Sequence, residues 1–285
     1  ARPIVLERGR DVDARTELVS SFWRGGALDP ECNVQFGEGG AGTFSDGKLH
    51  TGVNDPRMQQ ILREFVAFGA PSEILWDANP HVGTDYLKIV VKNIRLELEK
   101  LGAEVRFSHR LTGILTENGR VVGAEIRSPE GAYPLKTGHL VLAIGHSARD
   151  TFESLLAGGI TLVQKPFSIG ARIEHPQSLI NALQYGAAAS HPALGAADYK
   201  LALHLPGGRS VYTFCMCPGG TVVAAASEPD SVVTNGMSYY ARDGVNANSA
   251  LLVGIGPEDF GSEHPLAGMF LQREIERRAF VLGGR

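Results

Sequence analysis

The sequence predicts an α/β protein in which a parallel sheet carries a small antiparallel meander and is followed by a second, mainly antiparallel α+β domain. Three observations support this prediction. An apolar run ends at Glu7, a glycine-rich stretch covers residues 37–49, and a second apolar run enters a turn at Gly145. Buried parallel strands have continuous apolar runs, and open α/β sheets bind ligands at the carboxyl ends of their strands. We therefore expect Glu7 and Gly145 to lie near a ligand.

The run Pro3–Leu6 is expected to form a short buried strand, with Glu7 just past its end. In a dinucleotide-binding βαβ unit, an acid at the end of the second strand accepts hydrogen bonds from the ribose hydroxyls. The glycine fingerprint of such a unit lies about 20 residues upstream of that acid. This chain has no sequence there. On spacing alone, Glu7 could equally be an ordinary solvent-facing glutamate.

The stretch from Gly37 to Gly47 holds five glycines in eleven residues. Glycine adopts positive φ and leaves room for a ligand where a Cβ would collide. Successive backbone N–H groups in such a turn can bind an anion. The alternative is a flexible surface loop, because many turns have this composition.

Two helices and a strand are expected after this loop. Asp55 is expected to cap the first helix, which stops at Gly69, and Thr84 to cap the second, which ends at Gly102. Residues 103–107 are expected to form the strand that follows.

The next segment predicts an antiparallel meander. Leu111–Thr116 and Val121–Arg127 flank Asn118-Gly119, the strongest short signal for a hairpin. A second turn follows at residues 128–131. The apolar run 139–144 then predicts a buried parallel strand that enters the Gly145 turn.

A short helix is expected over Asp150–Ala157, and after it the pattern changes to short strands. We place the domain boundary near residue 160 for this reason. The strands expected in the second domain are Ser168–Glu174, Lys200–Leu205, Val211–Met216 and Thr221–Ala226.

The composition excludes several classes of protein. Hydrophobic residues make up 43% of the 285 residues and charged residues 20%, which is typical of soluble globular proteins. The net charge of −4 argues against a nucleic-acid partner, and no apolar run is long enough to span a membrane. The three cysteines favour a reducing cytoplasm over a disulfide framework, and without a Cys-x-x-Cys pair no metal site is expected.

Four segments taken together resemble the FAD-dependent dehydrogenase-like flavoproteins, which have the glutathione-reductase-type fold with two dinucleotide domains. These segments are Glu7-Arg8-Gly9, the loop 37–49, residues 143–150 and residues 214–220. Residues 166–177 and 235–252 extend the resemblance over essentially the whole chain.

The resemblance implies a fold and a chemistry. The fold is a partial Rossmann-like FAD-binding domain over residues 1–160 and a substrate or cap domain over residues 161–285. The implied cofactor is FAD, with NAD(P)H as a candidate electron donor and a small molecule of unknown identity as the substrate. The implied function is that of an FAD-dependent oxidoreductase. A non-catalytic, flavoprotein-like binding scaffold is the alternative.

The chain also departs from the family. Family members begin with a Gly-x-Gly-x-x-Gly strand–turn–helix and end with a further FAD-contacting segment, and neither occurs here. The sequence is therefore interpreted as an internal fragment that binds FAD weakly or not at all. Its exposed sheet edges would favour self-association.

The glycine pattern and the resemblance together predict a set of cofactor-binding residues. Most contacts would come from backbone N–H groups, with Ser45 and Lys48 adding side-chain donors. The set consists of Glu7, Arg8, Gly37, Gly39, Gly40, Ala41, Gly42, Thr43, Ser45, Lys48, Leu111 and Gly145.

The sequence assigns no general acid or base, and its catalytic candidates are His146, Arg172, Cys215 and Cys217. In an alternating strand the two cysteines would share one face and could act as a redox dithiol or a thiolate nucleophile. Unreactive buried cysteines are the alternative. Arg172 could bind an anionic substrate or pair with an acid such as Glu174. Residues 235–244 are expected at the domain interface.

Overall fold

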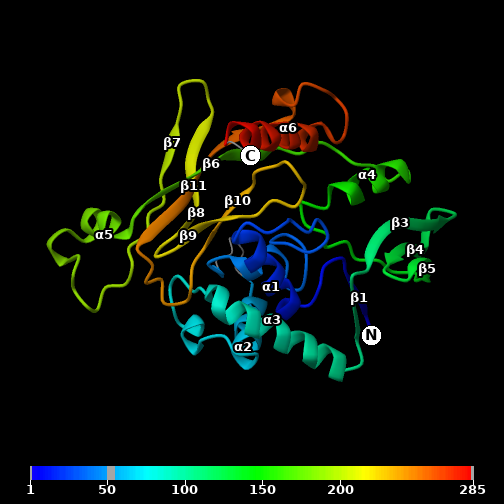
Figure 1. Cartoon of the computed structure of the whole chain (residues 1–285), viewed down its shortest axis with the longest axis horizontal. Coiled ribbons are helices and arrows are strands. Elements are labelled where there is room, and N and C mark those ends of the chain that lie inside the picture. The colour runs from blue at the N-terminus through cyan, green and yellow to red at the C-terminus, as the bar shows by residue number, and fades with distance from the viewer. Residues whose placement is uncertain (1, 50–54, 284–285) are drawn as a thin grey trace.

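The computed structural model describes residues 2–49 and 55–283, which form a mixed α/β structure with several antiparallel sheets (Figure 1). Its α-helices are α1 (Val12–Trp23), α2 (Arg57–Ala67), α3 (Gly83–Lys100), α4 (Arg149–Ala157), α5 (Gln177–Tyr185) and α6 (Ala267–Leu282). Its strands are β1 (Ile4–Glu7), β2 (Glu104–Phe107), β3 (Arg110–Glu117), β4 (Arg120–Ser128), β5 (Gly131–Lys136), β6 (Phe167–Pro176), β7 (Ala202–His204), β8 (Ser210–Cys217), β9 (Thr221–Ala224), β10 (Thr234–Met237) and β11 (Asn246–Ile255).

The first strand and its parallel partner form as the sequence predicts. β1 pairs in parallel with β2, and Glu7 lies opposite Phe107 at the end of the pair. The burial of this strand was overestimated, because Ile4 and Val5 are 41% and 40% exposed. The pair is a two-stranded sheet, so β1 has a free edge within the described part of the chain.

The predicted meander is confirmed. β3, β4 and β5 form a three-stranded antiparallel sheet, which projects from the right of the molecule in Figure 1. Asn118 and Gly119 both have positive φ, at 50° and 74°, as a tight two-residue hairpin turn requires.

The predicted buried strand over residues 139–144 is wrong. In the structure this run forms no strand, and Val141 and Leu142 are 89% and 42% exposed. A strand must exchange hydrogen bonds with a neighbour, and within the described residues no strand pairs with this run. Hydrophobicity alone therefore does not place it in a sheet.

The prediction that Thr84 caps α3 is also wrong. α3 begins at Gly83, and Thr84 lies inside its first turn. The buried Thr84 hydroxyl donates to the carbonyl oxygen of Thr43 at 2.8 Å. This bond ties α3 to the glycine loop, and the position of Thr84 inside the first turn is what excludes it from the flanking cap position.

The second half is built around a four-stranded antiparallel sheet of order β6-β11-β8-β7. The four strands predicted from the sequence correspond to β6, β7, β8 and β9. Four further elements, α5, α6, β10 and β11, were not predicted. β11 pairs over its whole length with β6 and also with β8, so it is the strand that joins the sheet together.

The halves on either side of residue 160 share a core. Val19, Val34 and Phe44 from the first half pack with Ala225, which directly follows β9. In Figure 1 the β9–β10 hairpin lies above α1. Within residues 2–49 and 55–283, no helix has both the length and the hydrophobicity needed to cross a bilayer.

Candidate functional site

The glycine loop, residues 37–49, is built around the buried side chain of Arg15. Arg15 lies on α1 and is fully buried. Its guanidinium donates to five carbonyl oxygens, at distances from 2.6 to 3.2 Å. The acceptors belong to Asn33, Val34, Gly37, Glu38 and Gly40. Burial lowers the pKa of Arg15 to about 10, which still leaves it charged at neutral pH.

The glycines of the loop fall into two groups. A Cβ on Gly37 would collide with Arg15, and one on Gly39 would collide with Thr43. A Cβ on Gly40 or Gly42 would meet only open space. The inner glycines are therefore needed for packing, whereas the outer pair leaves one face of the loop uncovered.

Gly145 also has open space where a Cβ would be, and its φ is +69°. The residues beside it are used differently. His146 is exposed and lies 3.2 Å from the Ser147 hydroxyl. Arg149 is buried and forms ion pairs with Glu228 at 2.9 Å and Glu276 at 2.6 Å, so it ties α4 to α6.

Glu7 is placed between β1 and the loop. Its Oε1 atom accepts from the N–H groups of Gly9 at 2.8 Å and Gly37 at 2.9 Å. Both bonds use the same oxygen of the carboxylate. Glu7 thus organises the loop at the position predicted for a ribose-binding acid.

Arg8 is engaged with acids of the protein itself. Its guanidinium forms a bidentate pair with Asp150, at 2.9 and 3.0 Å, and also bonds Glu31. Arg110, which precedes Leu111 at the start of β3, joins the same Asp150 at 2.9 Å. Leu111 is therefore held close to the end of β1.

The hydroxyl groups of Thr43 and Ser45 form hydrogen bonds with backbone groups of the loop itself. The Thr43 hydroxyl is buried and donates to the carbonyl of Glu38 at 3.2 Å. The Ser45 hydroxyl donates to the Gly42 carbonyl at 2.7 Å and accepts from the Gly47 N–H at 3.0 Å. Ala41 lies between the two outer glycines, where the chain turns into a short 3₁₀ helix.

Asp46 connects the loop to the second half of the chain. It is 1% exposed and receives the Ser238 hydroxyl, the Arg242 guanidinium at 2.6 Å and the Lys48 ammonium at 2.8 Å. Burial alone would raise the pKa of Asp46. The hydrogen bond from Arg242 and the charge of Lys48 outweigh it and lower this pKa to about 2.

Residues 235–244 lie against the glycine loop and the start of α3. Asn235 donates to the carbonyl of Phe44 at 3.0 Å. The N–H of Tyr240 donates to Asp85 at 2.9 Å, and the Tyr240 ring stacks on His81.

Lys48 and Arg172 meet at the end of β8. The Lys48 ammonium donates to the carbonyl of Met216. The Arg172 guanidinium donates to the carbonyl of Cys215 at 3.2 Å and to the side chain of Asn248 at 2.6 Å. The structure therefore brings the glycine loop, one predicted arginine and the two predicted cysteines together, while His146 lies elsewhere.

Sequence reasoning missed Arg15 and Asp46. Arg15 had a usable signal, because it falls three residues after Val12 and four before Val19, on the buried stripe of α1. An arginine at such a position needs acceptors inside the protein. Asp46 had no comparable signal, since two of its partners, Ser238 and Arg242, are almost two hundred residues away in the sequence.

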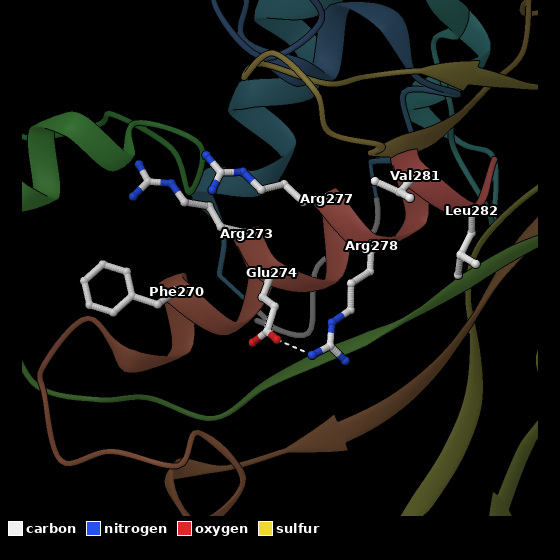
Figure 2. A pocket seen from close by; sticks show the side chains of 7 residues that line it. All are labelled: Phe270, Arg273, Glu274, Arg277, Arg278, Val281 and Leu282. Atoms are coloured by element: carbon white, nitrogen blue, oxygen red, sulfur yellow. Dashed lines mark hydrogen bonds and ion pairs between the residues drawn. The ribbon is translucent and has the colours of Figure 1, made fainter. Parts of the chain in front are cut away.

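One hollow of the molecule lies away from this loop. It is an open depression of about 780 Å³ along α6, shown in Figure 2. Arg273 and Arg277 extend to one side of the helix, and Glu274 pairs with Arg278 on the other. Its lining residues are Phe270, Arg273, Glu274, Arg277, Arg278, Val281 and Leu282. Among the described residues no cluster of three potential metal ligands occurs.

Comparison with known proteins indicates which cofactor the residues of this chain are associated with. Residues 166–285 match the family model described as "FAD-dependent protein, C-terminal domain-like". An uncharacterized protein of Clostridium beijerinckii is 54% identical over 284 residues. That match covers 99% of this chain and 52% of the relative, so the chain spans about half the length of the curated relative it matches.

Solved structures that resemble the chain include a flavin-dependent brominase and L-amino acid deaminase from Proteus vulgaris. The brominase is 12% identical, with a TM-score of 0.38 over 97% of this chain and 63% of its own. The deaminase is 12% identical, with a TM-score of 0.36 over 91% and 80%. The family match, and not these structures, supports the cofactor. Residues 166–285 are similar to the C-terminal domain of FAD-dependent proteins, and FAD is the cofactor that this match supports.

Proposed function

We propose that this chain belongs to an FAD-dependent oxidoreductase, with the outer face of the glycine loop as part of its cofactor site. The observation that supports this most directly is the open space at Gly40 and Gly42, next to a loop that is otherwise tightly packed. Open space at Gly145 adds a third glycine of the same kind. A glycine with nothing at its Cβ position suits a ligand that comes close to the backbone.

The residues present fit such a cofactor in specific ways. The backbone between Gly40 and Gly42 would lie along the cofactor, and Glu7 Oε2 would accept from a ribose hydroxyl. Arg15 would fix the loop from inside and would not touch the cofactor itself. FAD, when bound, would supply two-electron chemistry such as hydride transfer.

The proposal extends to the organisation of the protein. Residues 1–160 would form the partial Rossmann-like FAD-binding domain and residues 161–285 the substrate or cap domain. NAD(P)H is the proposed electron donor, and the substrate would be a small molecule. The parallel β1–β2 pair, the meander and the family match over residues 166–285 support this division.

We also propose that residues 1–285 bind FAD only weakly on their own. The run 139–144, which leads into Gly145, is exposed and has no pairing strand within the described residues. A turn supported by such a run is poorly fixed, so binding must also supply the cost of ordering it.

The test compares two Gly→Ala variants at open sites. Gly42 and Gly207 both have free space at the Cβ position and no positive φ, and Gly207 lies in the turn between β7 and β8. In the complete protein, we expect Gly42→Ala to weaken FAD binding about tenfold or more, because a methyl group would occupy the ligand's space. Gly207→Ala should leave it unchanged.

The readout is a fluorescence titration of FAD, followed by reductive titration of the bound flavin. Absence of bound flavin in the complete protein would overturn the proposed function. Bound flavin with equal affinities in the two variants would place the cofactor elsewhere. Flavin that binds but cannot be reduced would instead favour the alternative function, a non-catalytic, flavoprotein-like binding scaffold.

A further inference from the structure

The backbone at Cys215 departs from regular strand geometry. Cys215 has a φ of +48°, a region that non-glycine residues rarely occupy. The register between β8 and β11 shifts at this point, between Asn248 and Ala250 on β11. This irregularity breaks the alternation that would have put Cys215 and Cys217 on one face. Cys215 is half-buried, whereas Cys217 is fully buried. Strained residues of this kind cluster at functional sites.

Two cations hold the two peptide groups that flank Met216. Arg172 from β6 donates to the Cys215 carbonyl at 3.2 Å, and Lys48 from the glycine loop donates to the Met216 carbonyl. Asp46 lies 2.8 Å from Lys48 but is shared with Arg242. The charges that act on Cys215 are those of two cations, Lys48 and Arg172, and of one carboxylate, Asp46, so its neighbourhood is positive overall.

Cys217 is packed directly behind this group. Its S–H donates to the carbonyl oxygen of Cys215 at 3.3 Å, and this single hydrogen can rotate to the neighbouring Cys215 sulfur when that sulfur is ionised. A Cβ on Gly236 would collide with Arg172 and meet the Cys217 sulfur at 2.8 Å, so Gly236 allows these side chains to come together. Asn248 is fully buried beside them, and its Nδ2 has no hydrogen-bond partner within the described structure. A buried amide donor without an acceptor suits a site that receives an anion.

The charges act on the two thiols in opposite directions. A hydrogen bond from Cys217, with the positive charges of Lys48 and Arg172, lowers the pKa of Cys215 to about 6, although burial and Asp46 oppose the shift. The same hydrogen bond and burial raise the pKa of Cys217. Burial also raises the pKa of Cys32. At neutral pH, Cys215 therefore holds far more thiolate than Cys32 or Cys217.

We propose that Cys215 is a nucleophilic thiolate that reacts with small anionic disulfides, and that Cys217 is a positioning residue which donates a hydrogen bond to it. The Cys215 sulfur attacks one sulfur of the disulfide, and the bond between the two disulfide sulfurs breaks. The products are a mixed disulfide on Cys215 and one free thiolate, so one thiol is oxidised as one half of the reagent is reduced. This activity goes beyond the proposed function and requires no bound flavin.

The first test uses the three cysteines as internal references. The native chain is treated with limiting iodoacetamide between pH 5 and pH 9, and peptide mass spectrometry measures each cysteine. Cys215 should react with a midpoint near pH 6 and at least about tenfold faster than Cys32 at pH 7. A midpoint at or above about 8.5, the value of an ordinary thiol, would overturn the proposal. So would a rate no higher than that of Cys32.

A pair of variants tests the role of Cys217. Cys217→Ala removes the hydrogen-bond donor and should raise the Cys215 midpoint by about 1 pH unit. Cys217→Ser keeps a donor and should keep the low midpoint. A purely structural role for Cys217 would leave both midpoints equal, and this result would refute the assigned positioning role. Circular dichroism verifies that both variants are folded.

The substrate class is tested with two probes of opposite charge. The dianionic dithiobis(nitrobenzoate) should react with Cys215 faster than dicationic cystamine, after each rate is divided by its rate with free cysteine. The mixed disulfide should be found on Cys215 and should be missing in Cys215→Ala. Equal normalised rates, or an adduct mainly on another cysteine, would contradict the proposal.

Discussion

The glycine loop and the run 139–145 were both predicted to approach a ligand, yet the structure treats them differently. The loop closes around Arg15 and is tied to the rest of the chain by Asp46. The run that leads into Gly145 is exposed and forms no strand. The glycine loop is held by hydrogen bonds and ion pairs from side chains around it. The apolar run 139–144 has no strand to pair with in the described structure.

The difference shows what a local sequence can achieve. Five carbonyl groups of a turn-rich segment can be satisfied by one buried guanidinium, because a guanidinium offers five N–H donors in a fixed plane. An apolar run has no side-chain donors that could satisfy its backbone carbonyl groups. It becomes a strand only when another strand satisfies its backbone groups.

The largest effect is expected at Arg15. Arg15→Met should lower the free energy of unfolding by about 4 kcal/mol, because five carbonyl groups of the loop and its surroundings lose their donor. Arg15→Lys keeps the charge but loses the planar set of donors and should show an intermediate loss. Urea unfolding measures both. A loss below about 1 kcal/mol for Arg15→Met would mean that the loop does not depend on this residue.

The next largest effect separates the inner and outer glycines. Gly37 and Gly40 both have positive φ, at +121° and +61°, but only Gly37 has a neighbour where the Cβ would be. Gly37→Ala should cost about 3 kcal/mol, and Gly40→Ala only about 1 kcal/mol from backbone strain. Thermal and urea unfolding provide the comparison. Similar costs at the two positions would show that packing against Arg15 contributes little.

A smaller effect concerns the pH dependence of Asp46. Its pKa of about 2 in the folded protein lies below the ordinary value near 3.9, so the unfolded chain binds more protons in between. Stability from Asp46 is therefore complete above about pH 5 and is lost as the pH falls through 2. Asp46→Asn should cost about 2 kcal/mol at pH 7 and flatten the acid side of the profile. An unchanged acid limb would argue against the ion pairs with Arg242 and Lys48.

The smallest effect is expected at Val141. Because Val141 is 89% exposed, Val141→Ser should change stability by less than about 0.5 kcal/mol. Val34 is a matched control, since it is fully buried, and Val34→Ala should cost about 2 kcal/mol or more. If Val141→Ser proved as costly as Val34→Ala, the run would be buried as the sequence first suggested.

Local signals in the sequence predicted much of the fold. Asn118-Gly119 placed the meander correctly, since both residues adopt the positive φ that such a turn needs. Four strands of the second half were found from their apolar spacing. The run 139–144 and the Thr84 cap failed for different reasons. The run has no pairing strand within the described residues, and Thr84 lies inside the first turn of α3, where its hydroxyl donates to Thr43.

The candidate site was predictable only in part. Glycines that permit a close approach can be recognised from composition, and so can an acid at the end of a strand. The interior supports are harder, because Asp46 meets Arg242 and Lys48 meets Met216 across long sequence separations. Contacts of this kind depend on the completed fold and leave no periodic pattern.

The contacts of Asp46 and Lys48 have a consequence for how the molecule opens. Lys48 touches both Asp46 in the loop and the Met216 carbonyl on β8, and the loop carbonyls of Asp46 and Gly47 bind the N–H groups of Gly83 and Val82. Loosening the loop therefore also frees the entry to α3 and the end of β8. In hydrogen exchange, amides of these three distant segments should share one opening free energy and exchange as a single cooperative unit.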